Sequence, residues 1–557
     1  MSSKPAGMPL ESLYRHAEER PDDVYMIQPL GGGAVREYSW RETLEQSRRM
    51  AAYLKAHRFA PGSTISILSK NCAEFNMSVL AIWMAGYTAS AIYPTLDPDT
   101  VSYILTHSES KLLYVGKLDV WDQIAPGVPE ELPKVSYSLS PPNDFPSWSE
   151  IVEQTEPVAG QPSRDADDLA LLFYTSGSTG QPKGVETTFG HLAAAYRGIV
   201  ERFPLGPEDR YLSYLPMAHV METALGLNLA LGIGGQVFFA ESLDTFVQDL
   251  QRSRPTCFAS VPRLWLKFQQ GVFEKMPPKK LERLLKIPIL RGIVRKKVLR
   301  VLGLDQVRYA LTGSAPVPPE VVSWYRNLGL ELLEAYGMTE NLAYSHCSLP
   351  GKTRLGYVGH PMPGVECKIG DNDEILVRSP TTMRGYHKMP EATAEAITED
   401  GWLRTGDQGT IDERGRLKII GRVKELFKTS KGKYVHPVPI ESLLNADEHV
   451  ELSLVSGVGQ AQPVAIVMLA EQLRARTADP AVREQITRDL TELRNRVNDR
   501  LVSFERLGLI AVAKDDWSVE SGTLTPTMKI KRSEIEKLYQ PLFDDWFESG
   551  EPVVWHR

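Results

Sequence analysis

Residues 173–189 read FYTSGSTGQPKGVETTF and follow on from the apolar residues LALL at 169–172. An apolar run that ends in glycines and hydroxyl residues predicts a buried strand followed by a tight turn. The three glycines lack a Cβ, so backbone N–H groups can approach a negatively charged ligand closely. Lys183 adds a positive charge. The stretch predicts either a loop that holds phosphate groups or a plain solvated turn, because this composition is also common in linkers.

The spacing within this stretch excludes the common P-loop. A P-loop has the pattern G-x-x-x-x-G-K-[ST] at the start of a helix. Here Lys183 is followed by Gly184 and Val185 rather than by a serine or threonine. Any phosphate binding must therefore use a different arrangement, and the choice between a binding loop and a plain turn depends on the rest of the chain.

Length, charge and cysteine content restrict the possible classes of protein. The 557 residues exceed what a single hydrophobic core normally supports, so we expect at least two domains. A formal net charge of −7 gives no overall attraction to nucleic acid, and we expect no nucleic-acid partner. The four cysteines are far apart and form no C-x-x-C pair, which argues against a zinc site and a disulfide framework. These features favour a cytoplasmic, reducing environment.

Short β-rich runs alternate with helical patterns through the first 420 or so residues, as in STISILS at 63–69 and TCFASV at 256–261. This alternation is typical of an α/β architecture with largely parallel sheets. Frequent glycine and proline residues between short strand-like runs predict a β-rich subdomain at about 345–421. Two apolar runs after residue 421 and a long helical pattern near 484–502 predict a separate small α+β domain.

Two segments raise the question of membrane contact. The uncharged residues 76–96 are about as long as a membrane span, but their second half is small and polar. We expect a buried helix, a turn at Gly86 and a short strand there. Residues 274–304 are strongly basic, with apolar residues at helical spacing. This pattern predicts either a helix on an anionic membrane surface, which would make the protein peripheral to a membrane, or an ordinary solvated helix face.

Several further motifs follow in a characteristic order. They are YLPMAHVME at 214–222, LTGSAP at 311–316, EAYGMTE at 334–340, WLRTGDQG at 402–409, GRVKELFKTSKGKYVHPVPIE at 421–441 and LTPTMKIKR at 524–532. Together with the opening loop they resemble the adenylate-forming family of acyl-CoA synthetases, adenylation domains and luciferases, and the resemblance spans roughly residues 40–540. The fold it implies is α/β, with a large N-terminal domain of stacked sheets (1–421), a hinge (422–424) and a small mobile C-terminal domain (425–557).

The resemblance implies that ATP and Mg²⁺ bind in the N-terminal domain. The opening loop would hold the β- and γ-phosphates, Tyr336 would offer a face to adenine, and Asp407 would accept both ribose hydroxyls. Glu340 would bind Mg²⁺, since a hard cation on phosphate oxygens prefers a carboxylate. The implied nucleotide-binding residues are Thr175, Ser176, Gly177, Ser178, Thr179, Gly180, Lys183, Gly313, Ser314, Ala315, Glu334, Ala335, Tyr336, Gly337, Asp407 and Arg422.

The resemblance also implies the catalytic groups. Lys529 would bridge the substrate carboxylate and the α-phosphate, His219 would lie near that carboxylate, and Thr339 and Glu340 would act at the phosphates. Lys424 falls at the hinge, where many members have aspartate. The loop from Lys428 to Lys433, including Gly432, would then replace Lys529 when CoA is the acceptor.

The motif details resemble the long-chain branch, which implies a fatty acid as the substrate and CoA as the co-substrate. Three alternatives remain open: a fatty acyl-AMP ligase that loads a carrier-protein phosphopantetheine, a CoA ligase for aryl or other acids, and a non-catalytic nucleotide-binding protein. The small residues in TALGLNLALGIGGQ at 223–236 predict either room for an acyl chain or close helix packing.

Overall fold

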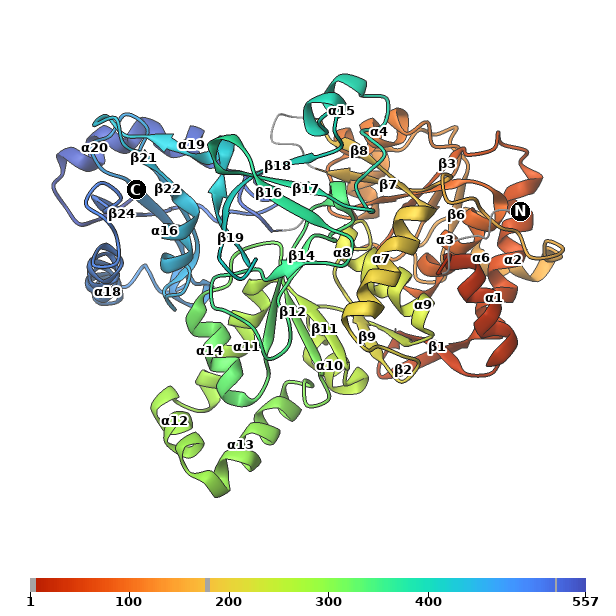
Figure 1. Cartoon of the computed structure of the whole chain (residues 1–557), viewed down its shortest axis with the longest axis horizontal. Helices are drawn as coiled ribbons and strands as arrows, with labels where there is room; N and C mark the ends of the chain where they lie inside the picture. Colours follow the sequence, from red (N-terminus) through yellow and green to blue (C-terminus); the bar gives the residue numbers. More distant parts are fainter. Residues whose placement is uncertain (1–6, 176–180, 526–527, 557) are drawn as a thin grey trace.

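The computed structural model describes residues 7–175, 181–525 and 528–556. Along the longest axis of the molecule, a six-stranded sheet lies toward one end, the C-terminal elements lie at the other, and strands β16–β19 lie between them (Figure 1). The expected α/β fold, with a large N-terminal part and a smaller C-terminal part, is confirmed.

The six-stranded sheet is parallel except at one edge, where β7 and β8 pair antiparallel. Strands β3 and β4 are buried along their whole length, as apolar strands covered on both faces should be. In spatial order the strands are β6 (Lys134–Ser136), β5 (Leu113–Val115), β3 (Thr64–Leu68), β4 (Thr88–Ile92), β7 (Leu169–Thr175) and β8 (Lys183–Thr188).

The nine-stranded sheet is parallel from β13 to β1 and antiparallel at its two edges. Its strands, in spatial order, are β15 (His360–Pro361), β14 (His346–Cys347), β13 (Leu332–Tyr336), β12 (Tyr309–Thr312), β11 (Cys257–Ser260), β9 (Arg210–Ser213), β10 (Gln236–Phe239), β1 (Val24–Gly31) and β2 (Ala34–Ser39).

Helices follow most strands of these two sheets. They are α1 (Pro9–Glu19), α2 (Trp40–Ala56), α3 (Ala73–Ala85), α4 (Pro98–His107), α5 (Trp121–Ile124), α6 (Trp148–Gln154), α7 (Phe189–Arg202), α8 (Val220–Glu222), α9 (Ala230–Ile233), α10 (Phe246–Ser253), α11 (Pro262–Lys275), α12 (Pro278–Lys286), α13 (Pro288–Val301), α14 (Pro319–Leu328) and α15 (Pro390–Ala396). A π-helical segment, Thr223–Leu229, joins α8 to α9.

The long apolar stretch at 76–96 forms the buried helix, turn and strand expected from the sequence. All thirteen residues of α3 are buried, and Gly86 ends the helix with a φ of 90°, which favours glycine. Strand β4 then begins at Thr88. Among the described residues, no helix combines the length and the apolar character that crossing a bilayer requires.

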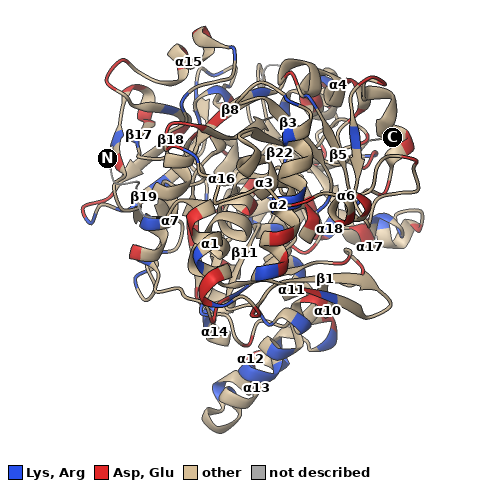
Figure 2. Cartoon of the chain, turned by 90° about the vertical axis from the view of Figure 1, so that its right-hand side faces the viewer, with Lys and Arg blue, Asp and Glu red and all other residues tan. Residues whose placement is uncertain are grey.

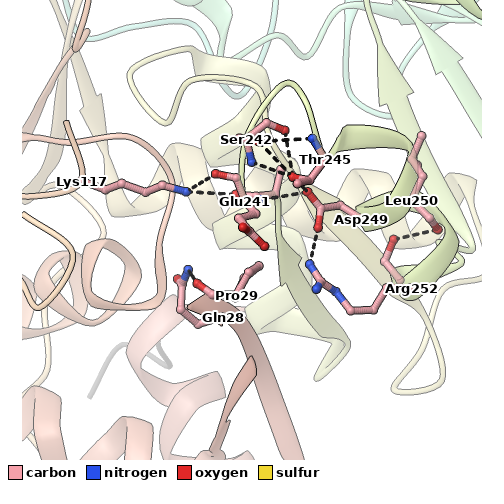
Figure 3. Close-up of polar contacts among 11 residues, drawn as sticks. Gln28, Pro29, Lys117, Glu241, Ser242, Thr245, Asp249, Leu250 and Arg252 are labelled. Carbon is pink, nitrogen blue, oxygen red and sulfur yellow. Dashed lines mark hydrogen bonds and ion pairs between the residues drawn. The ribbon is translucent and has the colours of Figure 1, made fainter. Parts of the chain in front are cut away.

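A polar cluster joins the two large sheets (Figure 3). Lys117, which follows β5, donates from Nζ to the backbone oxygens of Ala240 at 3.3 Å and Glu241 at 2.5 Å, just after β10. The Asp249 carboxylate on α10 accepts from the Glu241 N–H at 2.8 Å and from the Thr245 hydroxyl at 3.0 Å. The loop after β10 is therefore held from both sides, which fixes one sheet against the other.

A four-stranded antiparallel sheet follows, made of β16 (Glu366–Ile369), β17 (Glu374–Arg378), β18 (Leu403–Ile411) and β19 (Leu417–Arg422). This sheet accounts for most of the β-rich region expected at about 345–421. The first part of that region is different, because β14 and β15 add to the edge of the nine-stranded sheet.

The C-terminal part contains a two-stranded hairpin, β20 (Phe427–Lys428) and β21 (Tyr434–Val435), and a second four-stranded sheet. That sheet comprises β22 (Val450–Ser456), β23 (Val464–Leu469), β24 (Leu509–Val512) and β25 (Val553–Trp555). Its helices are α16 (Pro437–Leu444), α17 (Glu471–Arg474), α18 (Pro480–Asn498), α19 (Arg532–Tyr539) and α20 (Phe543–Glu548).

The long C-terminal helix differs from the expected 484–502. Helix α18 begins at Pro480, because the Asp479 side chain accepts from the Ala481 N–H and Pro480 occupies the first turn, and it ends at Asn498. Aspartate before proline is a strong helix start. The helix therefore begins and ends four residues earlier than the hydrophobic pattern indicated.

Candidate active site

The predicted site residues gather at the carboxyl ends of parallel strands. Strands β9, β12 and β13 belong to the parallel part of the nine-stranded sheet, so their carboxyl ends meet at one edge. The segments 214–222, 313–315 and 337–341 directly follow these strands. Ligands of open α/β sheets bind at this kind of edge.

The segment after β12 lies against β13. A Cβ on Gly313 would be 3.0 Å from the Ala335 backbone oxygen, so a side chain there would crowd the neighbouring strand. Ser314 has a φ of 69°, in the left-handed region that costs a non-glycine residue energy. Ala315 is exposed.

A short hydrogen-bonded chain links Tyr336, Asp407 and Arg422. The Tyr336 hydroxyl donates to Asp407 Oδ2 at 2.7 Å, and Arg422 Nε lies 3.0 Å from Asp407 Oδ1. Asp407 and Arg422 sit opposite each other on β18 and β19. Burial and the neighbouring carboxylate raise the pKa of Tyr336, so its phenol stays protonated and donates. The Asp407 side chain is 17% exposed and that of Arg422 50% exposed.

Gly337, Thr339 and Glu340 form a compact loop after β13. A Cβ on Gly337 would come within 2.4 Å of the Ala343 backbone, so only glycine fits there. The Glu340 backbone oxygen accepts from the Met383 N–H at 2.7 Å. The Glu340 side chain accepts a hydrogen bond at 2.8 Å from the hydroxyl of Tyr386. One carboxylate oxygen of Glu340 is therefore anchored, and the loop conformation is set by backbone contacts.

Lys183 lies near the same tyrosine. Its Nζ sits over the Tyr386 ring, 4.8 Å from the ring centre, in a cation–π contact. Thr175 pairs with Lys183 where β7 and β8 meet. The other predicted loop residues, Ser176, Gly177, Ser178, Thr179 and Gly180, lie outside the described residues.

Glu334 and Ala335 lie on β13. Burial raises the pKa of Glu334 to about 8. At neutral pH this side chain is therefore largely protonated and carries little negative charge.

His219 is held in one orientation and stays neutral. Asn71 anchors its segment by donating to the Leu215 backbone oxygen at 2.7 Å and accepting from the Met217 N–H at 3.2 Å. His219 Nδ1 accepts from the Met221 N–H at 3.2 Å, so the proton of the neutral ring is on Nε2. Burial, with a contribution from the charge of Lys529, lowers the pKa of His219 to about 4. The ring can therefore donate from Nε2 to an anionic group at neutral pH.

Lys529 reaches this region from the C-terminal part of the chain. The turn that carries it is closed by the Thr525 N–H, which donates to the Lys529 backbone oxygen at 2.8 Å. The residue keeps part of its surface in contact with solvent, although other protein groups surround its ammonium. Desolvation by the surrounding protein and repulsion from Arg422 lower the pKa of its ammonium, while the negative charge of Asp407 opposes this. His219 and Asp407 thus both lie within electrostatic range of Lys529.

The predicted hinge begins at Arg422 of this cluster, and the predicted second loop follows it along the chain. Lys424 is in a short 3₁₀ turn, Val423–Glu425, directly after β19. Lys428 pairs with Tyr434 in the β20–β21 hairpin and lies over its ring at 5.5 Å. Gly432 turns this hairpin with a φ of 76°.

Two residues in this region had no role assigned from the sequence. Glu222 is fully buried, accepts from the Tyr211 hydroxyl at 3.1 Å, and has its pKa raised by burial to about 8. The only sequence feature that pointed to Glu222 was its position in the motif YLPMAHVME. Tyr386 lies in MRGYHK at 383–388, a stretch with no chemical pattern, so nothing in the sequence indicated its contact with Glu340.

The small residues at 223–236 serve close packing at two positions. A Cβ on Gly226 would lie 2.4 Å from a Glu222 carboxylate oxygen. A Cβ on Gly232 would lie 2.3 Å from the ring of Tyr196. Close packing against neighbouring side chains is sufficient to explain why these two residues are glycine.

Comparison with protein families decides the assignment. Residues 13–387 match the AMP-binding enzyme family, and residues 425–551 match the AMP-binding enzyme C-terminal domain. The chain belongs to the AMP-binding enzyme family. This confirms the resemblance to the adenylate-forming enzymes that the ordered motifs indicated.

Curated relatives of this AMP-binding enzyme include long-chain-fatty-acid–CoA ligase 1 of Cavia porcellus, which is 29% identical over 92% of this chain and 82% of the relative. A putative fatty-acid–CoA ligase of Mycobacterium tuberculosis is 32% identical over 69% of this chain and 74% of its own length. Similarity of this extent supports an acid–CoA ligase within the family.

Solved structures share the fold at lower identity. The adenylation domain of a carboxylate reductase from Mycobacterium chelonae superposes with a TM-score of 0.82 at 22% identity, covering 98% of this chain and 92% of that domain. The o-succinylbenzoate CoA synthetase of Bacillus subtilis, in complex with its acyl-adenylate, gives 0.74 at 22% identity, covering 94% and 97%. These matches establish the fold of the whole AMP-binding enzyme.

The buried carboxyl of Glu222 predicts a pH-dependent stability difference. Its pKa is raised from 4.5 to about 8, so between these values the folded state retains a proton that the unfolded chain has lost. The contribution of this group to stability is therefore full below pH 4.5 and declines as pH rises toward 8. Glu222→Gln removes this decline and should stabilise the protein by up to about 3 kcal/mol at neutral pH, with little difference in acid.

Urea unfolding of wild type and Glu222→Gln at several pH values measures this effect. Glu282→Gln, at an exposed position, serves as the matched control. A difference in stability between Glu222→Gln and wild type that does not change between pH 4.5 and 8 would contradict the raised pKa of Glu222.

Proposed function

We propose that this protein activates a long-chain fatty acid with ATP and transfers the acyl group to CoA, releasing AMP and pyrophosphate. The observation that carries the proposal is the convergence of three groups from distant parts of the chain: neutral His219, the Tyr336–Asp407–Arg422 chain, and Lys529. Its membership of the AMP-binding enzyme family supports the adenylation half of this reaction.

In the first step a carboxylate oxygen of the acid attacks the α-phosphorus of ATP. A new P–O bond forms, the bond to the β-phosphate oxygen breaks, and pyrophosphate leaves with the bonding electrons. Two anions must approach each other, so the site has to supply positive charge and oriented donors. Lys529 and Arg422 supply the charge, and Nε2–H of His219 supplies a donor for the carboxylate.

Asp407 would accept the ribose hydroxyls of the nucleotide. Its carboxylate is fixed by Tyr336 and Arg422 on either side, which restricts its rotation before the nucleotide arrives. Tyr336 ends β13, residues 313–315 follow the neighbouring strand β12, and these two segments would enclose the adenine ring. Thr339, in the loop after β13, would contact the α-phosphate.

Mg²⁺ fits the Glu340 carboxylate. Among the described residues there is no group of three or more His, Cys, Asp or Glu side chains suited to a metal ion. Mg²⁺ needs fewer than three protein ligands, because it is usually held by one or two carboxylates together with substrate phosphates and water. Glu340 keeps one oxygen free of Tyr386 for this purpose, and the bound ion would neutralise phosphate charge. The Bacillus subtilis relative has been solved with ATP and a magnesium ion.

In the second step the thiol of CoA would attack the acyl carbonyl, and AMP would leave. We propose that the C-terminal part, 425–557, turns about Lys424 between the two steps, and that the loop from Lys428 to Lys433 then replaces Lys529. The β20–β21 hairpin is compact and turns at Gly432, so it could move as a unit. Such exchange would keep water from the acyl-adenylate.

The choice of a long-chain fatty acid rests on the curated relatives, which include long-chain-fatty-acid–CoA ligases from animals, plants and mycobacteria. The solved structures of similar fold include CoA ligases of aryl acids. Aryl acids are therefore included in the substrate test.

Substitution of Lys529 should separate the two half-reactions. Lys529→Ala removes the ammonium that offsets the negative charge of the adenylation transition state, so acyl-adenylate formation should fall by roughly 100-fold or more. Thioester formation from supplied acyl-adenylate should be nearly unchanged, because Lys529 would have left the site by then. Pyrophosphate release and acyl-CoA formation measure the two steps.

The matched control is Lys537→Ala, which removes an exposed lysine of α19 whose partner is Glu534 on the same helix. This control should retain both half-reactions. Equal loss of both steps in Lys529→Ala would contradict the proposed exchange of loops.

The substrate class is tested by pyrophosphate release from ATP and Mg²⁺ over saturated fatty acids of increasing length and over aryl acids, each with and without CoA. We expect sustained turnover that requires both a long chain and CoA. Release that CoA leaves unchanged but a phosphopantetheinylated carrier protein accelerates would indicate a fatty acyl-AMP ligase. Turnover restricted to aryl acids would contradict the fatty-acid assignment, and no release with any acid would contradict enzymatic activity.

A further inference from the structure

The helices α12 and α13 form a hairpin that projects from the body of the molecule (Figure 1). It is inserted between α11 and β12 of the nine-stranded sheet. Residues 278–301, which make up this hairpin, contain nine Lys or Arg and only one acidic residue, Glu282. The whole chain carries −7, so positive charge is concentrated on this one projection. Figure 2 shows that concentration along α12 and α13.

One face of the hairpin is fixed to the body. Leu281 and Val298 are buried, 1% and 8% exposed, in a core that they share with Trp265 and Tyr325. Arg295 donates from Nε to the Asn327 backbone oxygen at 2.7 Å, next to the end of α14. The hairpin is therefore a packed part of the fold with a defined outer surface.

The outer surface carries basic side chains that no carboxylate neutralises. Within the described part of the chain, no ion pair involves any of the seven exposed residues Lys279, Lys280, Arg283, Lys286, Arg291, Lys296 and Lys297. Arg300 differs, since it lies 3.8 Å from Asp305 at the base of the hairpin. The outer basic residues thus keep their full charge for an external partner.

The tip of the hairpin adds apolar groups to this charge. Ile289 is 83% exposed, Ile293 63% and Ile287 44%. Ile287 joins α12 to α13, and Ile289 and Ile293 lie in the first half of α13, close in sequence to Lys286 and Arg291. Exposed isoleucines among lysines and arginines are the pattern of helices that lie in the interface of an anionic membrane. Nucleic-acid sites instead pair basic residues with aromatic rings that stack on bases, and residues 278–301 contain no aromatic residue.

We propose that the α12–α13 hairpin docks this protein on the surface of an anionic lipid bilayer. The basic residues bind the lipid headgroups, and the tip isoleucines enter the boundary between headgroups and acyl chains. The proposal goes beyond the ligase activity and does not depend on it, because it rests on the charge and exposure of the hairpin alone.

Sedimentation with vesicles tests the proposal. The full-length protein is mixed with vesicles of phosphatidylcholine alone or of phosphatidylcholine with phosphatidylglycerol. We expect binding to the anionic vesicles, weakened by high salt, and little binding to the neutral ones. Binding to both kinds equally, or to neither, would overturn the proposal. Tight binding of an oligonucleotide without binding to anionic vesicles would also overturn it.

Two variants locate the binding surface. Replacing Lys286, Arg291, Lys296 and Lys297 by glutamine should weaken binding about fivefold for each residue, and so by roughly 100-fold or more in total. Ile289→Ser with Ile293→Ser should weaken binding without changing net charge. Arg295 is left intact because it anchors the hairpin to Asn327.

The matched control replaces four exposed lysines of the body by glutamine: Lys55, Lys111, Lys352 and Lys514. It removes the same charge and should change binding much less. An equal loss in the control would mean that net charge, and not the hairpin, governs binding. Circular dichroism and pyrophosphate release in solution verify that each variant is folded. Because sedimentation needs no catalysis, its outcome stands even if the proposed ligase reaction fails.

Discussion

The hydrogen bond from Tyr336 to Asp407 is the contact on which the candidate site depends. Tyr336 ends β13 of the nine-stranded sheet, and Asp407 lies on β18 of the following antiparallel sheet. One bond of 2.7 Å thus ties two separately formed sheets together at the point where the predicted ribose and adenine contacts meet. Arg422, on the other side of Asp407, is the last residue of β19 and the first residue of the predicted hinge, 422–424. The same carboxylate therefore contacts both the predicted adenine residue on β13 and the end of the strand that leads into the C-terminal part.

Most of the fold could be predicted because the strands that matter are continuous apolar runs. STISIL and TCFAS became the buried strands β3 and β11, and the long apolar stretch at 76–96 divided at Gly86 as its composition indicated. The residues of the candidate site could be named because each lies in a motif, and the structure brings His219, Tyr336, Asp407, Arg422 and Lys529 into one region. Their catalytic roles stay predictions. Boundaries were less accurate: α18 begins at Pro480 because a local cap outweighed the hydrophobic period.

What could not be predicted depends on contacts between distant parts of the chain. Tyr386 meets Glu340 only after the segment that carries it folds beside β8, at the isolated pairing of Val185 with Tyr386. The depth at which Glu222 is buried follows from its position against Tyr211 and Gly226, which no local pattern specifies. The basic segment at 274–304 was ambiguous for a related reason. Its sequence could not show which face of each helix would be covered by the core around Trp265 and which would be left exposed.

The position of Tyr386 has a further consequence. One aromatic side chain contacts two groups of opposite charge: its ring faces the ammonium of Lys183, and its hydroxyl binds the carboxylate of Glu340. Any ligand that draws Lys183 away from the ring alters the surroundings of the group that orients Glu340. The charges of Lys183 and Glu340 are thus energetically coupled through the uncharged side chain of Tyr386. The effect of replacing Lys183 and Glu340 together should differ from the sum of the effects of the two single replacements, as is usual for residues that share a partner.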